Sequence, residues 1–117
     1  MDLENAVHAH AEWKVKLRAA IAKKDTLDAK TVSADNQCAL GKWLHGDGKS
    51  AHGKLAAFSE CVNSHAAFHR AAGQVVQAIN AKKFDEASKM LEAGTPFAKA
   101  STAVGIALAM LKRETTR

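Results

Sequence analysis

Four residues in this sequence carry side chains that together could bind a metal ion: His10, Cys38, His65 and His69. A cysteine thiolate and neutral imidazoles are the ligands that zinc prefers, and zinc takes four of them in a tetrahedron. His65 and His69 are four residues apart, so on a helix both rings leave the same face one turn apart. Two imidazoles in this arrangement can hold one ion, provided that the other two ligands come from elsewhere in the chain.

The second cysteine, Cys61, competes with Cys38 for the sulfur position. Cys61 lies one turn before His65, so ligands at these positions and at His69 would form a row along one helix and could hardly surround an ion. Cys38 comes from a separate segment, which suits a site whose ligands converge from different directions. We therefore predict that Cys38 is the ligand and that Cys61 is a small buried hydrophobic residue near the site.

The histidines also have a structural interpretation, because a single histidine on an apolar helix face is usually a core residue with one satisfied hydrogen bond. Three inward-facing histidines suit that interpretation less well, since each buried imidazole without a partner costs roughly 1–3 kcal/mol. One shared cation would partner all three. His8 lies about 200° round the helix from His10 and is expected to face solvent. His45 and His52 flank a pair of glycines and are expected to be exposed.

The elements that must position these residues are all predicted to be helices. The 117 residues are rich in alanine, contain no tyrosine and one proline, and few segments resemble strands. We expect one domain over residues 1–117, an all-α antiparallel helical bundle. Its predicted elements are a long N-terminal helix, a short cysteine-bearing helix and two long C-terminal helices, the last kinked or restarted near Pro96. They span about residues 2–23, 38–44, 50–80 and 84–113.

Local signals set the predicted ends of these helices. Asp2 can cap the first helix, and Asp35 or Asn36 can cap the cysteine-bearing helix. Residues 23–37 are expected to form a connection with one helical turn near its end. Residues 45–48 contain two glycines and are expected to form a loop.

Two features of the predicted site would favour a bound thiolate. Cys38 lies at the start of a short predicted helix, where the positive end of the helix dipole favours the thiolate. Trp13 and Trp43 are interpreted as a hydrophobic shell around the metal, which would strengthen metal binding and shield the sulfur.

Composition and motifs argue against several other classes of function. The net charge of +5 comes from lysines scattered among acidic residues, so we expect no nucleic-acid partner. Four candidate ligands leave no open position for water, unlike a catalytic zinc site. The chain has no paired Glu-x-x-His motifs, no phosphate-binding glycine motif and no Ser-His-Asp set. We therefore expect no enzyme activity.

The expected location is the cytoplasm. Two cysteines without a secretory signal indicate a reducing compartment rather than a disulfide framework. The longest low-charge run, residues 100–111, is too short to span a bilayer. We therefore expect no direct membrane insertion.

These motifs resemble those of the chemoreceptor zinc-binding domain, a small helical module found on bacterial chemoreceptors and some diguanylate cyclases. The family's pattern is a His-x-x-Trp in the first helix, a Cys-x-x-Gly-x-Trp segment and a later His-x-x-x-His. The three motifs occur here in the same order and at similar spacing, and the resemblance covers nearly the whole chain. They read His10-Ala11-Glu12-Trp13, Cys38-Ala39-Leu40-Gly41-Lys42-Trp43 and His65-Ala66-Ala67-Phe68-His69.

The resemblance implies one zinc ion bound by His10, Cys38, His65 and His69. It also implies a cytoplasmic domain, commonly a homodimer, that regulates a linked signalling module in the same or a parent chain. Zinc, or an oxidant such as hypochlorous acid acting on the zinc-bound cysteine, is the implied signal to chemotaxis or diguanylate cyclase control. A different function stays open, in which zinc permanently staples a purely structural dimerisation module with no sensing role.

Overall fold

The structure, a computed structural model, describes residues 2–36 and 38–115 of the chain. Every regular element in this part of the chain is a helix, which confirms the predicted all-α class. In chain order the helices are α1 (Leu3–Lys23), α2 (Ala29–Ser33), α3 (Ala39–Leu44), α4 (Asp47–His52), α5 (Ala56–Asn80), α6 (Phe84–Met90) and α7 (Pro96–Thr115).

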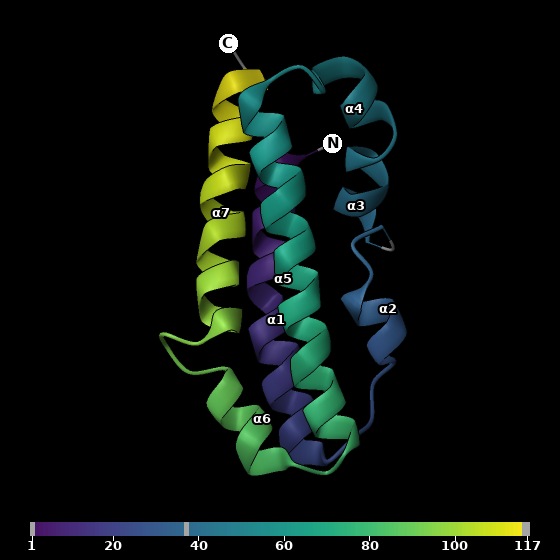
Figure 1. Ribbon diagram of the computed structural model, residues 1–117, viewed down its shortest axis with the longest axis vertical. Coiled ribbons are helices and arrows are strands. Elements are labelled where there is room, and N and C mark those ends of the chain that lie inside the picture. The colour runs from purple at the N-terminus through teal and green to yellow at the C-terminus, as the bar shows by residue number, and fades with distance from the viewer. Residues whose placement is uncertain (1, 37, 116–117) are drawn as a thin grey trace.

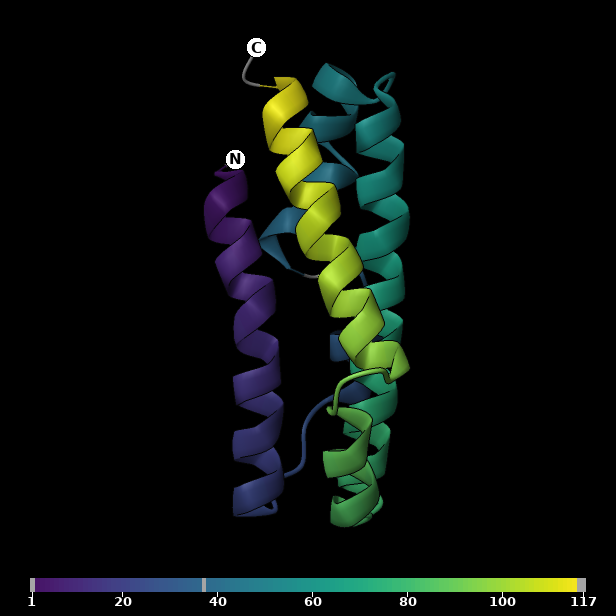
Figure 2. The ribbon, with the colours of Figure 1, turned by 90° about the vertical axis from the view of Figure 1, so that its left-hand side faces the viewer.

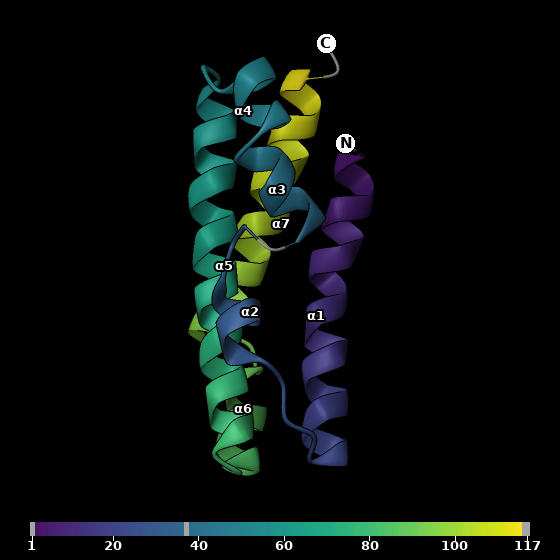
Figure 3. The same cartoon turned by 90° about the vertical axis from the view of Figure 1, so that its right-hand side faces the viewer.

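Three long helices, α1, α5 and α7, form what we call the long-helix scaffold (Figures 1 and 2). Helix α7 packs against both other helices and runs antiparallel to them. We call the short helices α2, α3 and α4 the short-helix segment. They lie one after another along α5, on the side away from α7 (Figure 1). Seen from that side, α3 lies between α1 and α5 (Figure 3). The short-helix segment therefore covers one flank of the scaffold.

The scaffold helices form because each combines a start signal or a long run of helix-forming residues with an apolar face. Helix α1 begins where the Asp2 carboxylate accepts a hydrogen bond from the Asn5 backbone N–H at 3.1 Å, as predicted. Helix α5 buries side chains that recur every three or four residues. These are Phe58, Cys61, His65, Phe68, Ala72, Val76 and Ile79.

Several predicted boundaries in the short-helix segment are wrong. The long helix predicted from residue 50 begins at Ala56, because residues 47–52 form the separate helix α4. Helix α4 includes residues 47 and 48, the second half of the predicted loop. Gly48 is buried in α4 because its bare backbone lies under the Trp43 indole, where a Cβ would come within 2.7 Å of the ring. The helical turn expected near residue 37 lies earlier, over Ala29–Ser33, because the Asp28 carboxylate caps it there.

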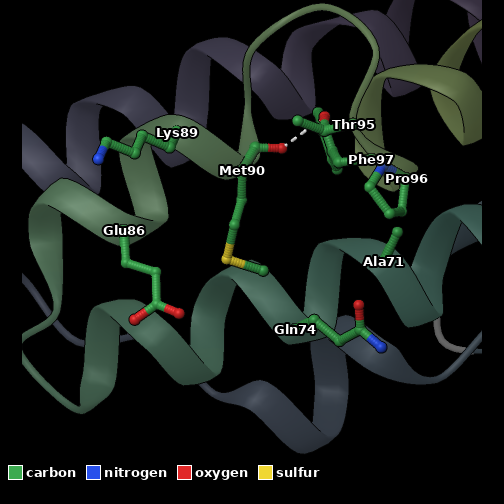
Figure 4. Close-up of a pocket in the computed structure, with 8 residues that line it drawn as sticks. All are labelled: Ala71, Gln74, Glu86, Lys89, Met90, Thr95, Pro96 and Phe97. Atoms are coloured by element: carbon green, nitrogen blue, oxygen red, sulfur yellow. Dashed lines mark hydrogen bonds between the residues drawn. The ribbon is translucent and has the colours of Figure 1, made fainter.

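The predicted break near Pro96 is a restart. Helix α6 ends at Met90, and α7 begins at Pro96, whose missing N–H costs nothing at a helix start. The Thr95 hydroxyl shares its proton between the carbonyls of Met90 and Glu92, at 2.8 and 2.7 Å, and Figure 4 shows the bond to Met90. The hydroxyl oxygen accepts the Ala98 N–H at 3.3 Å. Thr95 therefore closes the connection and caps α7.

Candidate metal centre

The four predicted ligands lie together on the flank of the scaffold. His10 comes from α1, Cys38 from the start of α3, and His65 and His69 from successive turns of α5. One donor atom of each lies within 4.8 Å of the donor atoms of the others. We call these four residues the histidine–cysteine cluster. Three segments that are distant in the sequence therefore converge on one point.

The separations within the histidine–cysteine cluster suit one tetrahedral ion. The Cys38 Sγ lies 3.3 Å from His65 Nε2 and 3.7 Å from His69 Nε2, and the two nitrogens are 3.0 Å apart. A tetrahedron with zinc bonds of about 2.05 Å to nitrogen and about 2.3 Å to sulfur places two nitrogens about 3.3 Å apart and nitrogen about 3.6 Å from sulfur. The donor atoms of Cys38, His65 and His69 thus lie within a few tenths of an ångström of that arrangement. The fourth donor, on His10, lies within 4.8 Å of them.

Backbone carbonyls orient two of the three imidazoles. His10 Nδ1 lies 2.8 Å from the Ala6 carbonyl, and His69 Nδ1 lies 2.9 Å from the Val32 carbonyl. A carbonyl can only accept, so each Nδ1 carries the proton and each Nε2 keeps its lone pair. A metal-binding histidine is usually held by this kind of second contact.

Two buried ring nitrogens have no hydrogen-bond partner among the described residues. One is His10 Nε2, which belongs to the donor set, and the other is His65 Nδ1. A buried polar atom without a partner is costly, so an ion bound by His10 Nε2 would remove one of these costs. The donor chemistry and this unpartnered nitrogen both fit a zinc ion.

Burial keeps two of these histidines neutral at physiological pH. It lowers the pKa of His65 from 6.5 to about 3, with a further contribution from the charge that His69 would carry. Burial also lowers the pKa of His10, and this effect outweighs the opposing contribution of the hydrogen bond to Ala6. Neutral imidazole is the form that binds a metal, so both rings are ready to act as ligands.

Cys38 is itself the N-cap of α3, which corrects the prediction that Asp35 or Asn36 caps this helix. Its Sγ accepts a hydrogen bond from the Gly41 N–H at 3.3 Å. Residue 41 must be glycine because the Asp35 carbonyl oxygen lies against its Cα, in the space that a Cβ would occupy. The glycine of the Cys-x-x-Gly motif therefore lets the chain fold back tightly beside the sulfur.

Among the described residues, the aromatic ring in contact with the histidine rings of the cluster is Phe68, whereas neither predicted tryptophan makes such a ring contact. The Phe68 ring packs edge-on against His10 and His69, with centroids 5.3 and 5.5 Å away. Trp43 instead contacts His52 and Phe58, at 6.0 and 6.1 Å. Trp43 is therefore part of the support for α4, since it also covers Gly48.

Trp13 is only partly buried, and the Lys16 ammonium lies 5.1 Å from its ring centroid. The remaining histidines largely lie where the sequence predicted. His8 and His45 are exposed, and His45 Nε2 lies 3.2 Å from an Asp35 carboxylate oxygen. His52 is half-buried against Trp43, so the expectation that it is exposed is wrong.

Cys61 lies outside the histidine–cysteine cluster, as predicted from its position in line with His65 and His69 on one helix. It is fully buried among apolar residues of α5, and burial raises the pKa of its thiol to about 11. A thiol in this environment stays protonated and unreactive. The two cysteines therefore differ sharply in environment.

A hollow of about 310 Å³ opens beside His10 and Cys38, between the first turns of α1 and the start of α3. Of the four cluster residues, only Cys38 is more than marginally exposed. A second hollow, of about 200 Å³, lies between α5, α6 and the start of α7, where Met90 and Gln74 line it (Figure 4). The second hollow contains neither histidine nor cysteine among its lining residues. A small solute would therefore approach the cluster past His10 and Cys38.

Two contributors to the site escaped the sequence analysis. The Val32 carbonyl belongs to the backbone, so its side chain gives no signal of the role. Phe68 lies on the same helix face as His65, so the helix period alone could have indicated it as a neighbour.

No helix in the described part of the chain is long and apolar enough to cross a membrane.

Comparison with known proteins gives one clear finding. No curated protein and no solved structure gives a significant match to the chain. The model of one family, the chemoreceptor zinc-binding domain, matches residues 10–76. This range covers more than half of the 117 residues and includes all four members of the histidine–cysteine cluster. The chain therefore belongs to the chemoreceptor zinc-binding domain family.

Proposed function

We propose that this domain binds one zinc ion through His10, Cys38, His65 and His69 and acts as a regulatory domain of bacterial signal transduction. Zinc occupancy would control a linked signalling module in the same or a parent chain, such as a chemoreceptor or a diguanylate cyclase. The observation that carries the proposal is the convergence of three imidazoles and one thiol within 4.8 Å. The zinc-binding family to which the chain belongs supports it.

The chain's own groups would prepare this site before the ion arrives. The Ala6 and Val32 carbonyls aim the lone pairs of His10 and His69 inward, and burial keeps the pKa of His65 low enough for a neutral ring. A bound zinc ion would supply the positive charge that stabilises the Cys38 thiolate. Because the ligands come from α1, α3 and α5, loss of the ion would loosen α3 from the scaffold.

The test is the zinc content of protein purified without added metal, measured by plasma mass spectrometry. We expect about one zinc per chain in the wild type and in Cys61→Ala, and a loss of zinc in Cys38→Ser. Serine is itself a good N-cap, so this variant removes the thiolate while α3 keeps a capping side chain. A wild type that took up no zinc under reducing conditions would contradict the proposal, as would full zinc retention in Cys38→Ser.

A second candidate function is oxidant sensing, which the partial exposure of Cys38 beside a hollow favours. Hypochlorous acid would oxidise the thiolate to a sulfenic acid: the sulfur loses two electrons and gains the hydroxyl oxygen, and the chlorine leaves as chloride. The site would then lose a ligand. We expect peptide mass spectrometry to find Cys38 oxidised at least ten times faster than Cys61, since burial raises the pKa of the Cys61 thiol to about 11. Equal rates would contradict oxidant sensing.

We further propose that the domain has no enzyme activity, forms a homodimer and works in the cytoplasm. The competing proposal is a structural dimerisation module with a permanent zinc. Exchange of bound zinc for isotopically labelled zinc separates the two: exchange within minutes supports a sensor, whereas exchange over days without any response to oxidant supports a staple.

A further inference from the structure

The segment around α2 is attached to α5 at three places along one stripe. At the far end, the Asn80 side chain accepts the Leu27 N–H at 3.0 Å and donates to the Leu27 carbonyl at 2.7 Å. At the near end, His69 Nδ1 donates to the Val32 carbonyl at 2.9 Å. Between them, Gly73 of α5 lies directly under Ser33. We call residues 27–33 the α2 strap; Figures 1 and 3 show it lying along α5.

The sequence spacing on α5 explains why one strap reaches all three places. His69, Gly73 and Asn80 follow one another at steps of four and seven residues, so they share one face of the helix. The strap itself contains a helix of only five residues, which is too short to be stable on its own. Its position is therefore set by its contacts with α5, and the buried Val32 side chain adds to them.

Gly73 is the contact that controls the distance between strap and helix. A Cβ built on Gly73 would lie 2.5 Å from the Ser33 Cβ and 3.1 Å from its Cα. The obstacle is thus close to the backbone of the strap, and no side-chain rotation can relieve it. Any side chain at residue 73 must push Ser33 away, and the Val32 carbonyl, one residue earlier, moves with it.

We propose that docking of the α2 strap on α5 and zinc binding at the histidine–cysteine cluster are coupled, with Gly73 and Asn80 as the positioning residues of the strap. The inference rests on the proposed zinc site. With the strap docked, the Val32 carbonyl holds His69 in the orientation that binds metal. With the strap displaced, the buried His69 N–H loses its acceptor and the ring is free to turn. Losing such a contact typically weakens metal binding by about 10–100-fold. By reciprocity, zinc binding tightens strap docking by the same factor.

The test compares two glycine-to-alanine changes in the interiors of long helices. Gly73→Ala obstructs the strap, whereas Gly105→Ala in α7 places its methyl group where nothing lies within 4 Å. Both gain the same helix propensity, so their difference isolates the strap contact. Zinc affinity is measured by competition with a chromogenic chelator. We expect about 10–100-fold weaker binding for Gly73→Ala and no more than about twofold change for Gly105→Ala.

Asn80→Ala provides a second variant if Gly73→Ala folds poorly, with the exposed Asn63→Ala of the same helix as its control. Hydrogen exchange gives an independent readout: zinc should slow exchange of residues 27–34 in the wild type, and this effect should shrink in Gly73→Ala and Asn80→Ala. A purely structural role would lower melting temperatures without changing zinc affinity, and that result would overturn the inference. Equal zinc affinity in Gly73→Ala and Gly105→Ala would also overturn it. So would a hydrogen-exchange rate of residues 27–34 that is the same with and without zinc. A wild type that binds no zinc would instead refute the proposed function itself.

Discussion

The long-helix scaffold and the short-helix segment are held in place by different physics. The scaffold helices have 20 to 25 residues and bury leucine, valine and phenylalanine side chains along continuous faces. The helices of the short-helix segment have five or six residues each and bury only one to three residues apiece. The scaffold is stabilised by its own apolar faces. In the short-helix segment, α2 depends on individual contacts with α5, and α3 and α4 contact each other.

This difference assigns separate roles to the two regions. The scaffold supplies His10, His65 and His69 from rigid helices, whereas the short-helix segment supplies the Cys38 sulfur and the Val32 carbonyl. A region held by few contacts opens more easily than a packed core. A change at the metal centre should therefore move the short-helix segment first and leave the scaffold folded.

The largest expected effect comes from a cavity in the scaffold. Leu108 is fully buried in α7, so Leu108→Ala should lower the free energy of unfolding of the metal-free protein by about 2–5 kcal/mol. This free energy is measured by chemical denaturation, with circular dichroism as the signal. Ile106→Ala, at a position that is 58% exposed on the same helix, is the control and should change it by less than about 0.5 kcal/mol. Equal effects would mean that α7 does not pack as described.

A smaller effect is expected from obstructing the short-helix segment. Gly41→Ala puts a methyl group against the Asp35 carbonyl, so we expect a loss of about 1–3 kcal/mol in the free energy of unfolding. Hydrogen exchange should locate the damage in residues 34–46 and spare α7. If exchange instead accelerated uniformly through the molecule, the two regions would form one cooperative unit and the comparison would fail.

The third expected effect is a pH dependence at the boundary between the two regions. Burial lowers the pKa of His10 and His65 in the folded protein, so below about pH 6.5 the unfolded chain takes up protons that the folded chain does not. The stability of the metal-free protein should therefore fall as pH falls, by up to about 1.4 kcal/mol per pH unit for each histidine. For His65 this loss continues until the pH reaches about 3.

Denaturation curves between about pH 7 and pH 5 measure this slope above the range in which carboxylates titrate. A flat profile in the wild type would show that His10 and His65 titrate in the folded protein as they do in the unfolded chain.

Helix periodicity made the scaffold predictable. It placed His10, His65 and His69 inward and His8 outward, and it placed Cys61 in the core. The same reasoning was less accurate in the short-helix segment. There, Cys38 rather than Asp35 caps α3, and α4 includes the second half of a predicted loop, because contacts with Trp43 and Asp35 outweigh local signals.

The sequence by itself therefore determined the helical class, the ligand candidates and the inward faces of the long helices, since all of these follow from residue types and a 3.6-residue period. Only the tertiary structure decided that Phe68 packs against His10 of the distant helix α1, that the Val32 carbonyl orients His69, and that Gly73 lets it do so. These are contacts between segments distant in the chain, and backbone groups take part in two of them. Every residue has the same backbone carbonyl, so the pattern of side chains cannot predict which carbonyl will orient a histidine in the folded chain.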